Sequence, residues 1–209
     1  MIKTIIFDFG GVIITLDQPQ AIRRFQALGL ADADKRLDAY TQGGIFGELE
    51  EGRITAEEFR IQLSALVGHE VSVDECRYAW VGYCKELPHR NLLKLKELRR
   101  RGYRLVLLSN TNPYMMSWAD SADFDGSGHP VSDYFDALYK SYEVGVMKPD
   151  PQFFRHVLES ERLNPAETLF VDDGTRNVAA AEALGFHTLC PANGADWTLS
   201  IEQTLSSLL

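Results

Sequence analysis

The sequence predicts an α/β fold in which a doubly wound parallel sheet carries an inserted small α-helical domain. Three short runs, residues 2–7, 103–108 and 168–171, are almost entirely apolar, which is typical of parallel strands that are buried on both faces. From residue 91 onward, strand-like and helix-like segments alternate, and this alternation favours a parallel sheet. Residues 17–88 instead show helical spacing and no strong strand signal, so they form an insertion after the first strand.

Local signals then predict the individual elements. The inserted block contains a helix near residues 22–30 and another that begins at Thr55, where Thr55 and Glu58 form a capping-box pattern. We expect residues 12–15 to be a short extended piece and residues 118–132 to be a long polar loop. The remaining expected elements are a helix at 91–99 ended by Gly102, strands at 103–108 and 136–139, a helix at 151–158, a strand at 168–171, a helix at 177–184 ended by Gly185, and a strand at 187–190. We place a core domain at 1–15 and 90–209 and the helical domain at 16–89.

The bulk properties exclude several classes of protein. The chain has 209 residues and a net charge of −9, which argues against non-specific binding to nucleic acid or anionic membranes. No apolar run approaches the roughly 18 residues that span a bilayer. The three cysteines show no zinc-binding pattern, and the sequence has no recognisable signal peptide, so we expect a cytoplasmic protein. No apolar stripe forces association, and we expect a monomer or a weak dimer.

Polar side chains follow the predicted strands where each strand ends. The carboxyl ends of parallel strands lie along one edge of a sheet, so these groups can converge there. Asp172 and Asp173 form the most informative segment, because two adjacent acids after a buried strand repel each other unless a cation lies beside them. The polar residues at this edge are Asp8, Ser109, Asn110, Lys148, Asp172 and Asp173.

These residue types suit phosphoryl transfer. A carboxylate can attack an electrophile and form a covalent intermediate, and hydroxyl or N–H donors can hold anionic oxygens. A pair of carboxylates together with Asp8 can bind Mg²⁺ through hard oxygen ligands. With the added charge of Lys148, such a group would neutralise a phosphoryl group and position it for in-line attack.

The same segments resemble the four motifs of the haloacid dehalogenase-like hydrolase superfamily. The resemblance covers the whole chain, and residues 16–89 lie where this family has its small helical cap. It implies a Rossmann-like core and a Mg²⁺-dependent hydrolase of the phosphatase branch, similar to phosphatases of sugar 1-phosphates. The matching segments are residues 7–12 (FDFGGV), 108–111 (LSNT), 148–150 (KPD) and 171–177 (VDDGTRN).

The resemblance also implies roles for individual residues. Asp8 would be the nucleophile that carries the phosphoryl group, Ser109 and the neighbouring Asn110 would bind the substrate, and Lys148 would pair with both Asp8 and the phosphoryl group. The metal ligands would be Asp8, the backbone carbonyl of Gly10, and Asp173, with Asp172 beside them or on a bound water.

One position departs from the family pattern. Typical phosphatases of this family have a second aspartate two residues after the nucleophile, which acts as general acid and base, and here that residue is Gly10. Such proton transfer contributes about 10²–10⁴-fold to the rate. The leaving group could need little protonation, as in an anomeric sugar phosphate. Alternatively, Asp17, His69, His89 or the substrate could supply the proton, or activity could be lost.

Two other functions remain open at this point. A 2-haloacid dehalogenase of the same superfamily also uses an aspartate nucleophile, but it needs no metal, and Asp172 and Asp173 favour phosphoryl transfer. A non-catalytic phosphometabolite-binding protein would retain the site and lose turnover through Gly10, although a binding protein needs no nucleophile.

Substrate selection is expected in the helical cap. Residues 42–47 contain three glycines and Phe46, and we expect this segment to face the cleft, with Phe46 as a substrate contact. In the alternative interpretation, the segment is an ordinary turn and Phe46 lies in the core of the cap.

Overall fold

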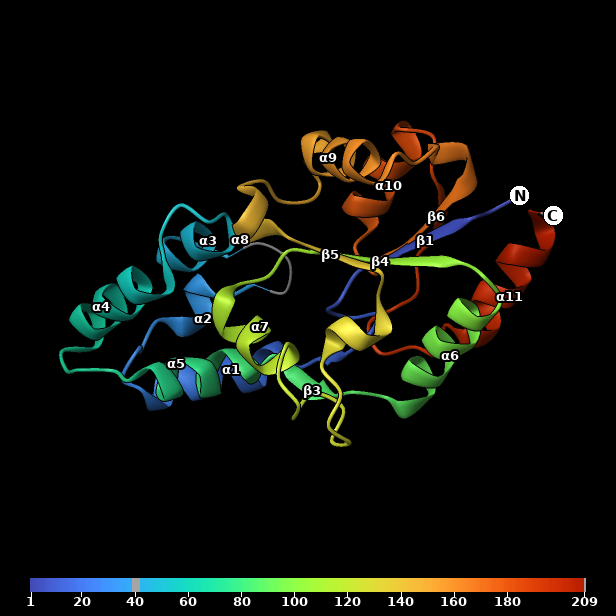
Figure 1. The fold of residues 1–209 in the computed structure, drawn as a ribbon. Coiled ribbons are helices and arrows are strands. Elements are labelled where there is room, and N and C mark those ends of the chain that lie inside the picture. Colours follow the sequence, from blue (N-terminus) through green and yellow to red (C-terminus); the bar gives the residue numbers. More distant parts are fainter. Residues whose placement is uncertain (39–41, 209) are drawn as a thin grey trace.

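The computed structural model describes residues 1–38 and 42–208, and a five-stranded parallel sheet lies at its centre (Figure 1). The order of its strands is β5-β4-β1-β6-β7, and every neighbouring pair is parallel. The predicted doubly wound parallel sheet is thereby confirmed. The strands are β1 (Thr4–Phe7), β4 (Arg104–Ser109), β5 (Ala137–Lys140), β6 (Thr168–Val171) and β7 (His187–Leu189).

Helices cover both faces of this sheet (Figure 1). Because successive strand residues point to opposite faces, Ile6 packs in the apolar cluster of α9 (Pro151–Glu161) and α10 (Thr175–Ala183). Phe7 points the other way, towards α6 (His89–Arg100) and α11 (Thr198–Ser207), and its ring lies 5.2 Å from that of Trp197. Burial on both faces explains why β1 has no polar residue after Thr4.

The inserted block is helical, as predicted, and it forms its own aromatic centre. The capping box of Thr55 and Glu58 is present at the start of α4. Trp80 contacts the rings of Phe25, Phe46 and Phe59 at centroid distances of 5.6 to 5.8 Å. The helices of the block are α1 (Gln18–Ala27), α2 (Ala33–Arg36), α3 (Ile45–Glu50), α4 (Ala56–Val67) and α5 (Val73–Val81).

A short strand within this block was not predicted. The strand β3 (Cys84–Glu86) pairs with β2 (Thr15–Leu16) in an antiparallel two-stranded sheet where the chain leaves and re-enters the core. Residues 17–88 show no strong strand signal in the sequence, and the structure adds this one short strand among the described residues of the block. Three residues with an exposed Lys85–Glu86 end carry no apolar run that could signal a strand. The domain boundaries stay a prediction, and β2 and β3 lie next to them.

The predicted loop at 118–132 is bounded by short helical elements, namely α7 (Pro113–Ala119) and the 3₁₀ turn η1 (Val131–Tyr134). Asp125 accepts hydrogen bonds from the backbone of Ser127 and His129 and from the Tyr134 hydroxyl, so its carboxylate organises the loop. Two further short elements are α8 (Ser141–Val144) and η2 (Pro165–Glu167). In the described ranges of the chain, no helix has the length and apolar character needed to cross a membrane.

Candidate active site

The predicted convergence of polar groups at the sheet edge is confirmed. Phe7 pairs in register with Leu107 on one side and Val171 on the other, so β1 and β6 end at the same level while β4 continues to Ser109. The residues that follow Phe7 and Val171, which are Asp8 and Asp172, therefore emerge side by side. The loop before α9 brings Lys148 to the same edge.

Lys148 is the electrostatic centre of the site. Only 3% of the residue is exposed, and its Nζ lies 2.8 Å from Oδ1 of Asp8 and 2.7 Å from Oδ2 of Asp172. The ammonium group also donates a hydrogen bond of 2.8 Å to the carbonyl oxygen of Leu108. All three ammonium hydrogens are thus directed to acceptors, and they fix the charge beside Asp8.

Asp172 holds Lys148 in place. Its carboxylate is fully buried and accepts hydrogen bonds from the backbone N–H of Gly174 and from the side chain of Asn177, in addition to the contact with Lys148. These donors compensate for the burial of the negative charge. The structure therefore places Asp172 behind Lys148, next to the predicted metal ligands.

Asn110 has a role that the sequence did not reveal. Its side-chain amide accepts a hydrogen bond from the backbone N–H of Lys148 and donates one to the backbone carbonyl of Lys148, each 2.8 Å long. This reciprocal pair ties the end of β4, which carries the buried Ser109, to the loop that carries Lys148. Both Ser109 and Asn110 line the cleft described below, and both stay proposed substrate contacts.

The donor set at this edge fits a divalent cation. Asp8, Asp172 and Asp173 each offer a carboxylate oxygen within 4.8 Å of the others. Hard oxygen ligands of this kind suit Mg²⁺. Burial is the largest cause of a raised pKa at Asp8, and with the charges of Asp172 and Asp173 it brings that pKa to about 8 against the opposing effect of Lys148. A cation beside Asp8 would therefore favour the ionised carboxylate that a nucleophile requires.

Gly11 makes room for Asp173. The backbone of Gly11 has a φ of +78°, and a Cβ atom at this position would lie 2.1 Å from Oδ2 of Asp173. Any side chain at residue 11 would displace the carboxylate that we expect to be the main metal ligand. Position 11 therefore requires glycine for two reasons: the positive φ of its backbone and the close approach of the Asp173 carboxylate.

We expect the Gly11→Ala variant to bind Mg²⁺ about 10–100-fold more weakly than the wild type, because its methyl group moves Asp173. Isothermal titration calorimetry with MgCl₂ measures this change. Gly126→Ala is the matched control, because Gly126 has a similar φ of +68° but no atom within 4 Å of an added Cβ. Both variants should lose about 1–2 kcal/mol of stability to backbone strain. Equal Mg²⁺ affinities in the two variants would contradict the proposed position of the metal.

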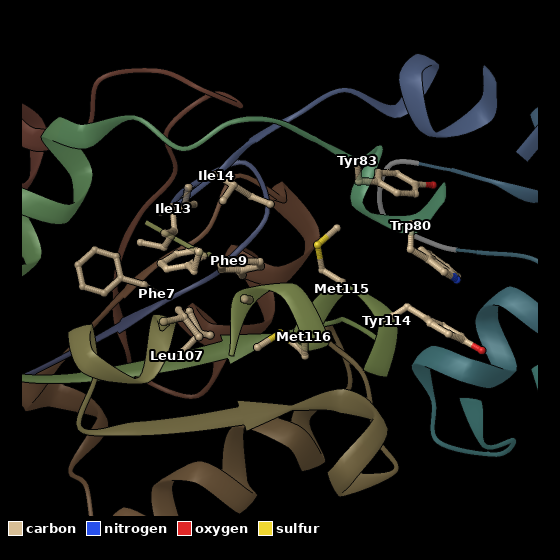
Figure 2. Close-up of a cluster of buried hydrophobic side chains, with 14 of the residues drawn as sticks. Phe7, Phe9, Ile13, Ile14, Trp80, Tyr83, Leu107, Tyr114, Met115 and Met116 are labelled. Carbon is tan, nitrogen blue, oxygen red and sulfur yellow. The ribbon is translucent and has the colours of Figure 1, made fainter. Parts of the chain in front are cut away.

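A cleft of about 80 Å³ lies between these residues and the helical block. On the core side, the cleft is lined by Asp8, Ser109, Lys148 and Asp173. On the side of the helical block, it is lined by Gln42, Glu50, Trp80 and Tyr83. In Figure 2, Met115 lies between Phe9 of the core and Trp80 and Tyr83 of the block. Tyr114, the neighbour of Met115 on α7, donates a hydrogen bond to the carbonyl of Ala56 in α4. The block is therefore docked against the core and forms one wall of the cleft.

The expectation that Phe46 contacts the substrate is wrong. Phe46 is fully buried among Phe25, Phe59 and Trp80, and it does not line the cleft. The alternative interpretation, in which Phe46 belongs to the core of the helical block, is confirmed. Within the segment 42–47, Gln42 lines the cleft, and Glu50 at the end of α3 lines it too. A single phenylalanine near a glycine-rich stretch gives no sequence signal that distinguishes a position in the core of the block from one in the cleft.

The three alternative proton donors lie away from the cleft. Asp17 caps α1 and accepts a hydrogen bond from the backbone of Gln20. His69 contacts the carbonyl oxygens of Leu28 and Glu70 on the exposed side of the helical block. Neither Asp17, His69 nor His89 lines the cleft. The structure instead places Glu50 there, and no sequence signal distinguishes Glu50 from the other acids in residues 48–51.

Comparison with known proteins agrees with this geometry. The family model of the haloacid dehalogenase-like hydrolases matches residues 2–185. A D-ribitol-5-phosphate phosphatase of Bacteroides thetaiotaomicron is 49% identical over 207 residues, which cover 99% of this chain and 100% of that protein. A predicted HAD-like hydrolase of Porphyromonas gingivalis has a TM-score of 0.93 at 43% identity over 98% of both chains. A HAD family enzyme of B. thetaiotaomicron, solved with magnesium and inorganic phosphate, has a TM-score of 0.86 at 34% identity over 96% of this chain and 99% of that one.

Proposed function

The chain belongs to the haloacid dehalogenase-like hydrolase family and is a magnesium-dependent phosphatase of a small metabolite, and we propose that its substrate is a sugar-alcohol phosphate of the D-ribitol 5-phosphate type. The observation that carries this proposal is a group of three neighbouring carboxylates, two of which contact one buried lysine, beside a cleft. The 49% identity to the D-ribitol-5-phosphate phosphatase, over nearly the whole of both chains, supports the substrate class.

We propose that catalysis passes through Asp8. A carboxylate oxygen of Asp8 forms a bond to phosphorus while the ester P–O bond breaks, and water later hydrolyses the aspartyl phosphate. Lys148 and Ser109 hold the phosphoryl oxygens, because both line the cleft beside Asp8. When bound, Mg²⁺ would neutralise the phosphoryl charge, and the side chains of Asp8 and Asp173 and the carbonyl of Gly10 would hold it, with Asp172 adjacent. The geometry of Lys148 supports these roles, since its ammonium group already contacts Asp8.

The substrate proposal changes the expectation for the leaving group. The resemblance suggested a sugar 1-phosphate, whose anomeric leaving group needs little protonation, as one of the open possibilities. D-ribitol 5-phosphate, the substrate in the name of the 49% identical relative, is the ester of a primary alcohol. We therefore propose that the leaving group is a primary alkoxide, which needs a proton as it departs.

A substrate panel tests this function. We expect Mg²⁺-dependent release of phosphate from D-ribitol 5-phosphate, with kcat/KM at least about tenfold above that for glucose 1-phosphate and glucose 6-phosphate, because the cleft must discriminate the remainder of the substrate. Removal of Mg²⁺ with EDTA should abolish the release. Phosphate release is measured with a colorimetric assay, and chloride release from 2-chloropropionate is measured in parallel. Chloride release without Mg²⁺ would instead identify a dehalogenase, and no release from any compound would favour a binding protein.

We also propose that the protein acts in the cytoplasm as a monomer or a weak dimer. The three cysteines support a reducing compartment, because Cys76, Cys84 and Cys190 are all free thiols.

A further inference from the structure

The proposed function leaves one chemical requirement without a residue. A primary alkoxide must gain a proton as it leaves, and Gly10 has no side chain to supply it. The space beside Gly10 is filled, since a Cβ atom there would lie 3.1 Å from a methyl carbon of Leu16. Another group that lines the cleft must therefore transfer the proton, and the following inference rests on the proposed function.

Glu50 is the ionisable group of the cleft that has no other role. Among the described residues that line the cleft, the ionisable side chains are those of Asp8, Glu50, Tyr83, Lys148 and Asp173. Asp8, Lys148 and Asp173 serve as nucleophile, charge partner and metal ligand in the proposed function. The single hydroxyl hydrogen of Tyr83 is directed to the carbonyl of Asp38, with Oε1 of Gln42 also within hydrogen-bond distance, and burial raises the pKa of Tyr83 well above its ordinary value.

Glu50 lies on the wall of the cleft that the helical block forms, opposite the residues of the core. It is the last residue of α3, only 7% of it is exposed, and its Oε1 accepts a hydrogen bond of 3.4 Å from Nδ2 of Asn112. Asn112 caps α7 and lies three residues after Ser109, which binds the phosphoryl group in the proposed function. This contact joins the helical block to the segment that follows β4, and both Glu50 and Asn112 line the cleft that Asp8 and Ser109 also line.

The protonation of Glu50 suits proton transfer near neutral pH. Burial is the main cause that raises the pKa of Glu50 to about 7, Asn112 opposes the shift, and Glu51 adds to it. The acids next to α3 and on the helices packed against it all have partners of their own. These partners are Arg53 for Glu51, Arg60 for Glu57, Lys140 for Glu143 and Thr55 for Glu58. On the core side of the cleft, the charged residues that line it are Asp8, Asp173 and Lys148.

We propose that Glu50 is the general acid and base of this enzyme and replaces the side chain that Gly10 lacks. In the first step, the ester P–O bond breaks as Asp8 bonds to phosphorus, and the departing alkoxide takes the proton of the Glu50 carboxyl group. In the second step, the Glu50 carboxylate takes a proton from water, the water oxygen bonds to phosphorus, and the bond between phosphorus and Asp8 breaks. Glu50 is then protonated again and phosphate is released, so each turnover consumes one water.

The dependence on the leaving group tests this role. Wild type, Glu50→Gln and Glu51→Gln are compared in Mg²⁺ with D-ribitol 5-phosphate, which has an alkoxide leaving group, and with p-nitrophenyl phosphate, whose leaving group needs no proton. We expect Glu50→Gln to lower kcat for D-ribitol 5-phosphate by about 10²–10⁴-fold, while the single-turnover burst of p-nitrophenolate changes less than about threefold. Glu51→Gln is the matched control. Glu51 pairs with Arg53 outside the cleft and acts on Glu50 only by adding to its raised pKa, so the control should change both values by less than about threefold.

Three results would overturn the proposal: an equal loss with both substrates, an unchanged kcat for D-ribitol 5-phosphate, or a change in KM alone. If Glu50→Gln does not fold by circular dichroism, Glu50→Ala is assayed with added formate, and restored turnover of D-ribitol 5-phosphate supports proton transfer whereas lack of restoration refutes it. Failure of the proposed function itself is distinct, because the wild type would then release no phosphate from either compound.

Discussion

Replacement of Asp8 by Asn is expected to reduce phosphate release by at least about 10⁴-fold, because the variant removes the nucleophile and with it the covalent route. The amide has nearly the same shape as the carboxylate, so Lys148 can retain its contact with Asp172 and the site can keep its geometry. The measurement is kcat with D-ribitol 5-phosphate at saturating Mg²⁺. Residual activity within about tenfold of the wild type would show that another residue attacks phosphorus.

The Asp8→Asn variant is also expected to be more stable than the wild type, which would show that its loss of activity is not caused by unfolding. The pKa of Asp8 rises from 3.8 to about 8 in the folded protein, mainly through burial. The folded state therefore binds this proton more tightly than the unfolded chain, and ionisation of Asp8 opposes folding as the pH rises through that interval. Without Mg²⁺, Asp8→Asn should unfold at a higher urea concentration than the wild type at pH 7, with a smaller difference at pH 4. A lower midpoint at pH 7 would contradict this account.

Replacement of Lys148 by Met is expected to lower the free energy of unfolding by about 3–5 kcal/mol, because it leaves the fully buried carboxylate of Asp172 without its cation and removes a contact of Asp8. Phosphatase activity should fall below detection in the same variant, since Lys148 also neutralises the phosphoryl group in the proposed function. Urea unfolding without Mg²⁺ measures the first effect, and phosphate release measures the second.

Lys140→Met is the matched control for this prediction. Lys140 also contacts two carboxylates, those of Asp120 and Glu143, but both acids are partly exposed, with side-chain exposures of 38% and 50%. Removal of this lysine should cost no more than about 1 kcal/mol, because exposed ion pairs contribute little. Adding Asp172→Asn to Lys148→Met should recover part of the lost stability and none of the activity. If Lys148→Met and Lys140→Met were equally stable, the buried pair would not be the main electrostatic support of the site.

The buried strands of the core could be predicted because each is a short apolar run in the sequence. The run at 168–171 coincides with β6, and the helix predicted from Thr55 begins where its capping box places it. The strand β3 could not be predicted, because it has three residues and gains its strand geometry by pairing with β2. The same holds for the reciprocal amide contact of Asn110 with Lys148, which joins residues 38 positions apart.

The sequence by itself determined the α/β class, the order of its elements and the set of residues at the sheet edge, because strand periodicity and the residues that follow a strand are local properties. Only the tertiary structure decided which side chains of the helical block reach the cleft. Phe46 and Glu50 lie on the same short helix, yet Phe46 packs into the aromatic centre and Glu50 meets Asn112 across the cleft. Side-chain direction on a helix repeats every 3.6 residues, but the face that meets the core depends on the elements that pack against α3, which include α4 and α8.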